Sequence, residues 1–208
     1  MREIGIFDGL ATGYDRGMLL LEWAVLRGLR RRAFPYVKGR VLEMGVGTGI
    51  NLPLYGPETQ VVALDASGPM LAEATHRRTR ATVRPVQADV QHLPFADGCL
   101  DAVTGSLLFC SVADPAQALA EVQRVLSPGG RLVLVEHTRG SGLGAWLTDV
   151  LHPLWFAVNG TCHLNRETVR AVAEAGFRLL RVETRLLGIF RIIEGETDRT
   201  PPTSGVAA

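Results

Sequence analysis

Cysteine is scarce in this sequence, and neither sign of charge is in excess. The 208 residues include three cysteines, Cys99, Cys110 and Cys162, and no two of them form a CxxC pair. An odd number of scattered cysteines in a chain long enough for a full hydrophobic core predicts reduced thiols, so we expect neither disulfides nor structural zinc. The 22 basic and 21 acidic residues leave a net charge of +1. No overall field therefore attracts the chain to a nucleic acid or another polyanion.

Long apolar runs are also missing. The longest, Met18 to Leu26, contains Glu22 and is about half of the roughly 20 residues that a membrane-spanning helix needs. Arg2, Glu3 and Asp8 interrupt the start of the chain, which does not resemble a secretory signal. We therefore expect a cytoplasmic protein that does not cross a membrane.

From residue 40 onward, short β-branched apolar runs alternate with helical patterns. This alternation is typical of βαβ units and a mainly parallel sheet. Two later runs, Phe177–Thr184 and Ile189–Glu194, are too close in sequence for a crossover helix and predict an antiparallel pair. The five earlier strands are predicted at Val41–Met44, Val61–Leu64, Val83–Gln87, Leu100–Ser106 and Arg131–Glu136.

Helix boundary signals separate these predicted strands. Asp114 is a predicted N-cap for a helix over Ala116–Leu126, and an earlier helix is predicted to begin near Ser67, with Pro69 in its first turn. A late helix is predicted to begin near Asn165, a natural capping residue, and to end at Gly176. The fold class is therefore α/β.

The same patterns divide the chain into three segments. Residues 1–39 are predicted to form an N-terminal helical lid segment, residues 40–195 one α/β domain, and residues 196–208 a disordered, proline-bearing tail. The N-terminal segment closes over a ligand, which we favour, or lies on an anionic membrane surface. Its pattern interleaves apolar residues with arginines, at Met18, Leu21, Leu26 and Leu29 and at Arg16, Arg27, Arg30, Arg31 and Arg32.

A glycine-rich turn, Glu43-Met44-Gly45-Val46-Gly47-Thr48-Gly49, follows the first predicted strand directly. Glycines at alternate positions let a ligand lie against bare main chain. Asp65, at the end of the second strand, is placed to accept hydrogen bonds from both hydroxyls of a ribose, and Asp89 follows the third strand, in position for an adenine amine. A nicotinamide dinucleotide fits less well, because its fingerprint needs a third glycine where Ile50 stands.

These residues resemble the class I S-adenosylmethionine-dependent methyltransferases. Leu93-Pro94-Phe95 and Ser127-Pro128-Gly129-Gly130 resemble the large subgroup, called type 11, that includes quinone-biosynthesis and small-molecule enzymes. The resemblance implies a Rossmann-like seven-stranded, mainly parallel sheet with an antiparallel edge strand and helices on both faces, and the cofactor S-adenosylmethionine. It implies cofactor contacts by Tyr14, Glu43, Gly45, Val46, Gly47, Gly49, Asn51, Asp65, Ala66, Met70, Asp89, Val90 and Ser106.

Two subgroups of this family are more similar than the rest. Val41–Tyr55 resembles bacterial phospholipid N-methyltransferases, which act on phosphatidylethanolamine. Phe109–Val112, Glu136-His137 and Cys162–Thr168 look more like the animal thiol S-methyltransferases. Because the second set belongs to the substrate half, the resemblance implies methyl transfer to a small, rather apolar thiol, with a phospholipid amine second and a quinone-like carbon or oxygen third.

The sulfonium methyl group of this cofactor is already activated, so the enzyme mainly holds a nucleophile in line and excludes water. We expect direct displacement without a metal, because no His/Cys/Asp/Glu cluster with ligand spacing is visible. His137, after the fifth strand, is the first candidate for a base, with a structural role equally open. His163 is the second candidate. Cys110 and Cys162 are expected to be small buried apolar residues.

The run Leu143–Val158 is rich in tryptophan and leucine, and in this family insertions after the fifth strand cover the acceptor pocket. It indicates a small-molecule or lipid-like apolar acceptor, unless the run is only core.

No basic stripe with interleaved aromatic residues is present, so we expect no nucleic-acid partner. Two other classes stay open: a sensor that binds the cofactor without catalysis, and peripheral membrane contact through the arginine-rich N-terminal helix. The sequence does not specify the oligomeric state.

Overall fold

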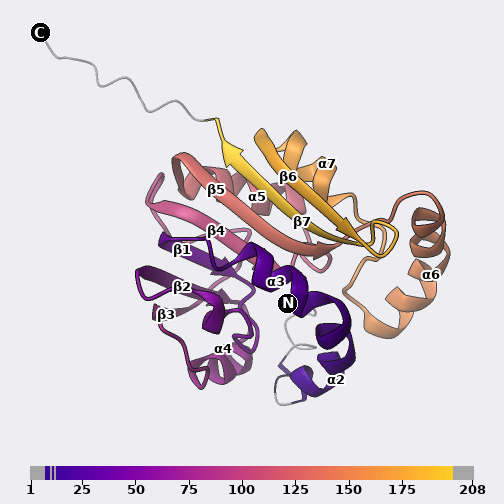
Figure 1. Cartoon of the computed structure of the whole chain (residues 1–208), viewed down its shortest axis with the longest axis horizontal. Coiled ribbons are helices and arrows are strands. Elements are labelled where there is room, and N and C mark those ends of the chain that lie inside the picture. Colours follow the sequence, from indigo (N-terminus) through magenta and orange to yellow (C-terminus); the bar gives the residue numbers. More distant parts are fainter. Residues whose placement is uncertain (1–7, 10, 12, 199–208) are drawn as a thin grey trace, which may run out of the picture.

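The computed structural model describes residues 8, 9, 11 and 13–198. Within these residues one seven-stranded sheet has the order β3-β2-β1-β4-β5-β7-β6 (Figure 1). Strands β3, β2, β1, β4 and β5 run parallel to one another. Strand β7 runs antiparallel to both β5 and β6. The strands are β1 Gly39–Met44, β2 Thr59–Asp65, β3 Thr82–Gln87, β4 Leu100–Ser106, β5 Leu126–His137, β6 Phe177–Arg185 and β7 Phe190–Thr197. The prediction of a mainly parallel sheet with an antiparallel pair at one edge is confirmed.

Helices cover both faces of the sheet, as predicted. The alternation of side chains along a strand sends Val133 and Val135 of β5 to one face and Leu132 and Leu134 to the other. Helices α3 and α4 pack on the first face, and α5 and α7 pack on the second. The helices are α2 Tyr14–Leu21, the π-helix η1 Glu22–Leu26, α3 Arg27–Ala33, the short 3₁₀ turn η2 Leu52–Leu54, α4 Gly68–Thr75, α5 Pro115–Val125, α6 Leu143–Asn159 and α7 Thr168–Glu174.

The predicted cap at Asp114 and the predicted helix start near Ser67 are both confirmed, and Ser67 caps its helix as well. The Ser67 hydroxyl accepts from the main-chain N–H of Met70 at 3.3 Å, at the start of α4. The Asp114 carboxylate accepts from the N–H of Gln117 at 3.0 Å, at the start of α5. Both side chains satisfy donors that the first turn of a helix leaves without partners.

Two predicted boundaries are wrong. The late helix begins at Thr168 rather than near Asn165, because the preceding segment is tied to other elements: His163 N donates to Cys110 O at 2.9 Å and the Arg166 guanidinium donates to Phe109 O at 2.6 Å. These tertiary hydrogen bonds outweigh the capping preference of Asn165. The predicted turn at residues 127–130 instead lies in β5, opposite an irregularity in its pairing with β4.

At the carboxyl end of the chain, β7 continues to Thr197, two residues past the predicted end of the domain. The rest of the predicted tail, from residue 199, lies outside the described residues, as do residues 1–7 of the predicted lid segment.

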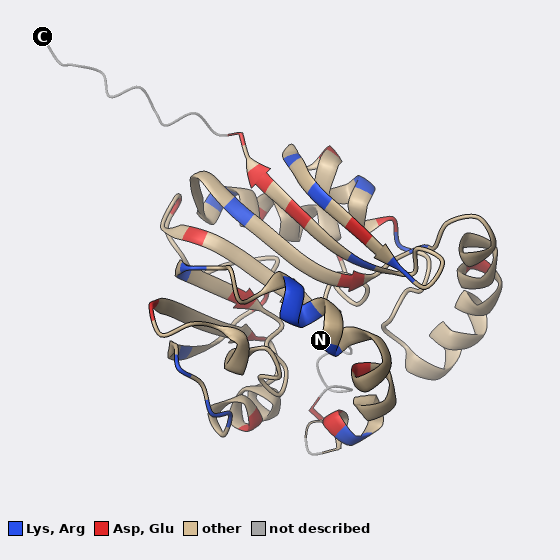
Figure 2. Ribbon diagram, in the orientation of Figure 1, with Lys and Arg blue, Asp and Glu red and all other residues tan. Residues whose placement is uncertain are grey.

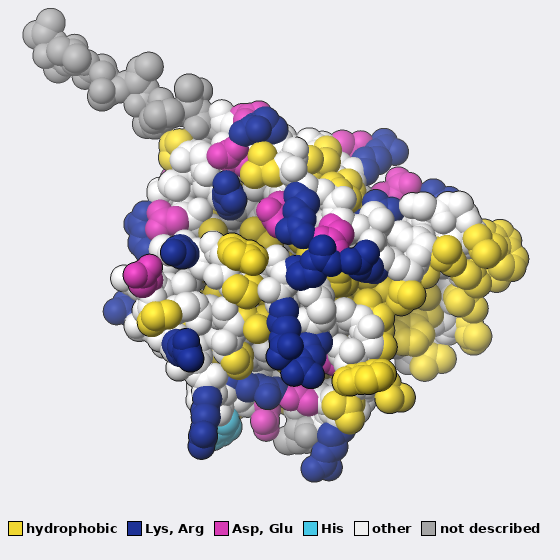
Figure 3. Space-filling view, viewed as in Figure 1, with side chains coloured by type: hydrophobic (Ala, Val, Ile, Leu, Met, Phe, Trp, Pro, Cys, Tyr) yellow, Lys and Arg dark blue, Asp and Glu magenta, His cyan; other side chains and the backbone are white. Residues whose placement is uncertain are grey.

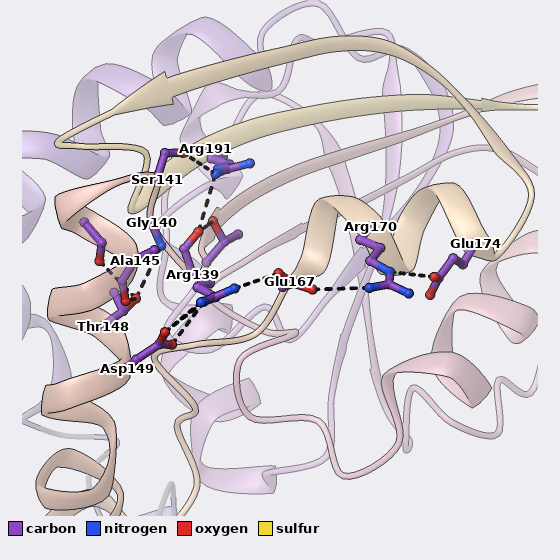
Figure 4. Close-up of polar contacts among 12 residues, drawn as sticks. Arg139, Gly140, Ser141, Ala145, Thr148, Asp149, Glu167, Arg170, Glu174 and Arg191 are labelled. Atoms are coloured by element: carbon purple, nitrogen blue, oxygen red, sulfur yellow. Dashed lines mark hydrogen bonds and ion pairs between the residues drawn. The ribbon is translucent and has the colours of Figure 1, made fainter.

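Helix α6 is attached to the body near its amino end (Figure 4). The Arg139 guanidinium, just after β5, pairs with Asp149 of α6 at 2.8 Å and with Glu167 at 3.2 Å. Gly144 packs against the main chain of Leu187, leaving no room for a Cβ atom. Within α6 only Gly144 and Thr148 are buried. The alternative that this run is only core is therefore wrong, because most of the helix projects from the body.

The projecting part of α6 is apolar. Figure 2 shows hardly any charge on it, whereas β6 and β7 carry both signs, for instance in the Arg181–Glu194 pair. Figure 3 shows hydrophobic side chains gathered over this helix. Its exposed large apolar residues are Leu143, Trp146, Val150, Leu151, Leu154, Trp155, Phe156 and Val158. Across the described part of the chain, no helix combines the length and apolarity needed to cross a membrane.

We expect Asp114→Ala to lower the free energy of unfolding by about 1 kcal/mol, because the first turn of α5 loses its cap. Chemical denaturation of the two proteins measures this difference. Glu58→Ala removes an exposed carboxylate whose contact with Lys38 is 3.8 Å long, and as a control it should change stability by less than about 0.5 kcal/mol. Equal stabilities of Asp114→Ala and the wild type would contradict a stabilising cap.

Candidate active site

A pocket opens at the carboxyl ends of the parallel strands β1 to β4, where ligands of open α/β sheets bind. Ten of the thirteen residues that we expected to contact the cofactor line this pocket. They are Tyr14, Gly45, Val46, Gly47, Asp65, Ala66, Met70, Asp89, Val90 and Ser106. Helix α2 contributes Tyr14, so residues far apart in sequence share one wall.

The turn after β1 depends on its glycines. Gly45, Gly47 and Gly49 have φ angles of 60°, 55° and 77°, a region that favours glycine over other residues. Space beside Gly47 is open, which suits a ligand lying on the main chain, whereas a Cβ on Gly49 would meet Ala74 and Leu52 within 3.1 Å. Gly49 is therefore a packing residue that does not line the pocket, and its contact with the cofactor stays a prediction.

Asp65 holds the glycine turn and also lines the pocket. Its Oδ2 accepts from Gly47 N at 2.8 Å, and its Oδ1 accepts from Ser67 N at 2.9 Å. Burial raises the pKa of this carboxyl, and the main-chain donors partly offset that effect. Each carboxylate oxygen can accept a further bond, so Asp65 can both hold the turn and bind the hydroxyls of a ribose.

Asp89 lies at the far end of the pocket, after β3. Its Oδ1 accepts from the main-chain N–H of Gln91 at 2.9 Å, and its carboxylate also contacts the Gln91 amide, at 3.1 Å and 3.0 Å. The carboxylate is thus oriented by its own loop, next to Val90. This position fits the predicted contact with an adenine amine.

Glu43 and Asn51 stand behind the pocket wall and do not line it, and their contacts with the cofactor stay predictions. Asn51 Nδ2 donates to Glu43 Oε1 at 2.7 Å and to Ser106 Oγ at 2.9 Å. Burial raises the pKa of Glu43 to about 7. The two residues connect the ends of β1 and β4 through buried hydrogen bonds.

Arg30 of α3 lines the pocket, whereas in the sequence it was only one of several arginines in the N-terminal segment. It is buried, with 5% of its surface exposed. Its Nη1 donates to Asn51 Oδ1 at 2.7 Å and to Ser106 Oγ, and its Nε pairs with Glu22 at 3.2 Å. Arg30 follows the buried Leu26 by one helical turn, and that spacing is the signal that could have identified it.

Helix α2 is fastened to the glycine turn. Asp15 accepts from the Thr48 hydroxyl at 2.6 Å and pairs with Arg77. Tyr14 beside it faces the pocket, and burial raises its pKa to about 12. The N-terminal helix α2 therefore contributes to the pocket wall. Its closure over a ligand, as a lid, stays a prediction.

Glu136 positions the loop after β4. Its Oε1 accepts from Leu108 N at 2.8 Å and from Phe109 N at 3.1 Å, and burial raises its pKa to about 7. Leu107, just before, has a φ of 53°, a strained value for a branched residue that functional loops often hold. Leu107, Leu108, Ser111 and Val112 of this loop line the pocket. The sequence placed the last two in a substrate-half motif and assigned no role to Leu107 and Leu108.

Neither histidine predicted as a base lines the pocket. His137 is buried, and its Nε2 lies 3.0 Å from Cys162 Sγ. The His163 ring packs against Phe156 and His152 of α6, with ring centroids 4.6 Å and 5.2 Å apart. Their predicted direct access to an acceptor in this pocket is therefore not seen.

Cys110 joins His137 and Cys162 in one cluster, with the Sγ and ring nitrogen atoms all within 4.8 Å of one another. The adjacent Cys110 side chain and burial raise the pKa of the Cys162 thiol. This finding overturns the expectation that the chain lacks a group of metal-ligating residues. The three residues are distant in sequence and follow no ligand spacing, so the sequence motifs that contain them did not indicate that they meet.

Comparisons with known proteins agree with this geometry. Residues 42–134 match the family model described as a methyltransferase domain. The chain is 35% identical over 153 residues to thiol S-methyltransferase TMT1B of Rattus norvegicus, covering 69% of this chain and 62% of that protein. It is 31% identical over 179 residues to human thiol S-methyltransferase TMT1A, covering 82% of this chain and 72% of that protein.

Two further similarities come from bacteria. The chain is 39% identical over 115 residues to phosphatidylethanolamine N-methyltransferase of Cereibacter sphaeroides, covering 52% of this chain and 57% of that protein. It shares its fold with the crystal structure of a SAM-dependent methyltransferase from Thermotoga maritima, with a TM-score of 0.73 and 23% identity over 93% of this chain and 99% of that one.

We expect Asp65→Ala to weaken the binding of S-adenosylmethionine by about 1–3 kcal/mol, because a buried hydrogen-bond acceptor is lost. Isothermal titration calorimetry of the purified chain measures the change. Asp101→Ala is the matched control, because Asp101 pairs with Arg40 near the amino ends of β1 and β4, away from the pocket. Wild-type affinity in Asp65→Ala would remove Asp65 from the ribose site.

Proposed function

The chain belongs to the S-adenosylmethionine-dependent methyltransferases, and on this premise we propose that it methylates the sulfur of a small, apolar thiol. The observation that carries the proposal is the composition of the pocket. Asp65 and Asp89 are its acidic residues, and both stand at the nucleoside end. The wall after β4 is mostly apolar and is formed by Leu107, Leu108, Ser111, Val112 and Ala113. An apolar acceptor fits this wall better than a cationic amine does.

The proposed cofactor contacts follow the strand ends. Asp65 binds the ribose hydroxyls and Asp89 the adenine amine. Met70 and Val90 contribute apolar surface to the nucleoside end. The Arg30 guanidinium suits the carboxylate of the methionine part, because arginine pairs with carboxylates through parallel hydrogen bonds.

The proposed reaction is a direct displacement. A thiolate sulfur attacks the methyl carbon of the sulfonium, so that a new sulfur–carbon bond forms as the old one breaks. The products are a methyl thioether and S-adenosylhomocysteine. An apolar wall favours this step, because it excludes water and holds the two sulfur atoms in line.

A second candidate acceptor is the amine of a phospholipid, which the exposed face of α6 favours. This helix of 17 residues has Asp149 as its charged residue and exposes Trp146 and Trp155. Helices with tryptophan and leucine on one face bind the interface of a lipid bilayer. We infer that α6 contacts membranes peripherally. The exposed arginines of α2 and α3, which exclude the buried Arg30, add attraction to anionic lipids.

The acceptor prediction is tested by incubating the purified chain with S-adenosylmethionine and a panel of alkyl thiols, aryl thiols, amines and phenols. We expect apolar thiols to form methyl thioethers, detected by mass spectrometry together with S-adenosylhomocysteine. Asp65→Ala serves as the control for cofactor dependence. If vesicles of phosphatidylethanolamine are methylated and every thiol is left untouched, the phospholipid reaction replaces the thiol reaction.

The membrane prediction is tested by flotation with vesicles of phosphatidylcholine and phosphatidylglycerol. We expect Leu154→Glu to reduce the bound fraction several-fold, because it places a charge on the apolar face of α6. Tyr36→Glu is the matched control, since it adds the same charge at an exposed aromatic residue outside α6. Equal binding of the wild type and Leu154→Glu would exclude α6 as the contact.

A further inference from the structure

The cluster of Cys110, His137 and Cys162 lies outside the proposed cofactor contacts. We propose that these three side chains bind one zinc ion. Two cysteine sulfurs and one imidazole nitrogen are a ligand set typical of zinc. A tetrahedral zinc site places its ligand atoms roughly 3.5–3.8 Å apart. In this structure His137 Nε2 lies 3.0 Å from Cys162 Sγ, and all three ligand atoms lie within 4.8 Å, so small side-chain rotations suffice.

Hydrogen bonds fix the main chain around each ligand. The loop of Cys110 is held by Glu136, which accepts from Leu108 N and Phe109 N. The segment of Cys162 is tied down where its N–H donates to Asn159 Oδ1 at 3.0 Å. The neighbouring His163 N donates to Cys110 O at 2.9 Å, which joins the two segments directly. The ligands are thus brought together before any metal binds.

A disulfide between Cys110 and Cys162 is the competing use of these sulfurs. Both are free cysteines in this structure. A disulfide gives no role to the buried imidazole, whereas His137 Nε2 faces Cys162 Sγ at hydrogen-bond distance. The position of His137 therefore favours a metal.

The cluster borders the proposed acceptor end of the pocket. Leu108 and Ser111 line the pocket on both sides of Cys110 in sequence. Tyr14 lines it too and interacts electrostatically with Cys110 and Cys162. Among the residues that the structure describes, the group contains three ligands. Three protein ligands with an open fourth position are typical of catalytic zinc, whereas structural zinc takes four.

The open position gives the zinc a role that rests on the proposed thiol reaction. The acceptor thiol binds through its sulfur and releases its proton to solvent, because a coordinated thiol is deprotonated. The bound thiolate then attacks the methyl carbon, and S-adenosylhomocysteine leaves as the sulfonium bond breaks. The metal replaces the base that we had expected His137 to be.

Metal binding is tested without any assay of activity. The full chain is reduced, stripped with a chelator and titrated with zinc, and the bound metal is counted by mass spectrometry. We expect one zinc per chain, and one cobalt(II) with a thiolate charge-transfer band. Cys110→Ser, Cys162→Ser and His137→Ala should each weaken binding at least ten-fold. Cys99→Ser is the matched control, because Cys99 lies outside the cluster, and it should bind like the wild type.

The proposal is overturned if the reduced chain retains no zinc, or if the three variants retain as much as the control. A disulfide found by mass mapping in a chain that binds no metal would assign the cysteines to redox chemistry instead. Circular dichroism checks the fold of each variant, and Cys162→His, which keeps a ligand, should restore part of the affinity.

Activity then separates the metal site from the proposed function. The stripped chain should bind S-adenosylmethionine with unchanged affinity and should methylate thiols at least ten-fold more slowly until zinc is added. If zinc binds but no thiol is methylated, the metal site stands and the thiol acceptor is wrong. If the stripped chain methylates thiols at the full rate, the acceptor stands and the role of the metal is wrong.

Discussion

The buried guanidinium of Arg30 is the interaction on which the arrangement of the pocket depends. A buried charge is costly unless it is paired and hydrogen-bonded. Arg30 meets this requirement with Glu22, Asn51 and Ser106, and Asn51 passes the connection to Glu43. The N-terminal helices are thereby held against the ends of β1 and β4. That placement brings Tyr14 to the pocket and Asp15 to Thr48 of the glycine turn.

The pocket has two halves that are built differently. At the proposed nucleoside end, Asp65 and Asp89 follow parallel strands directly, and main-chain donors orient both carboxylates. At the other end, the wall consists of the loop after β4, which Glu136 holds in a strained conformation. Strand pairing fixes the positions of residues at the strand ends, whereas the residues of a loop can change without altering the fold. Relatives that share a cofactor can therefore differ in acceptor, as the thiol and phosphatidylethanolamine enzymes similar to this chain do.

One segment joins the apolar face of α6 to the cluster of Cys110, His137 and Cys162. Cys162 and His163 follow α6 directly, and His163 packs on His152 and Phe156 of that helix. Arg139 anchors α6 to the body next to His137 in sequence. A surface that contacts a lipid bilayer would thus lie one short loop away from the proposed acceptor end.

The sequence by itself determined the sheet and the nucleoside end. Strand periodicity, the capping residues Ser67 and Asp114, and the glycine turn are local signals, and a residue at the end of a parallel strand has a known position in this fold. Tertiary structure alone decided that Arg30 turns inward, that Gly49 packs against α4, and that Cys110 meets Cys162. Each of these depends on contacts between segments distant in the chain, which no local pattern encodes. For the same reason α6, apolar enough to be core by its sequence, is left exposed: no other described element packs against most of its surface.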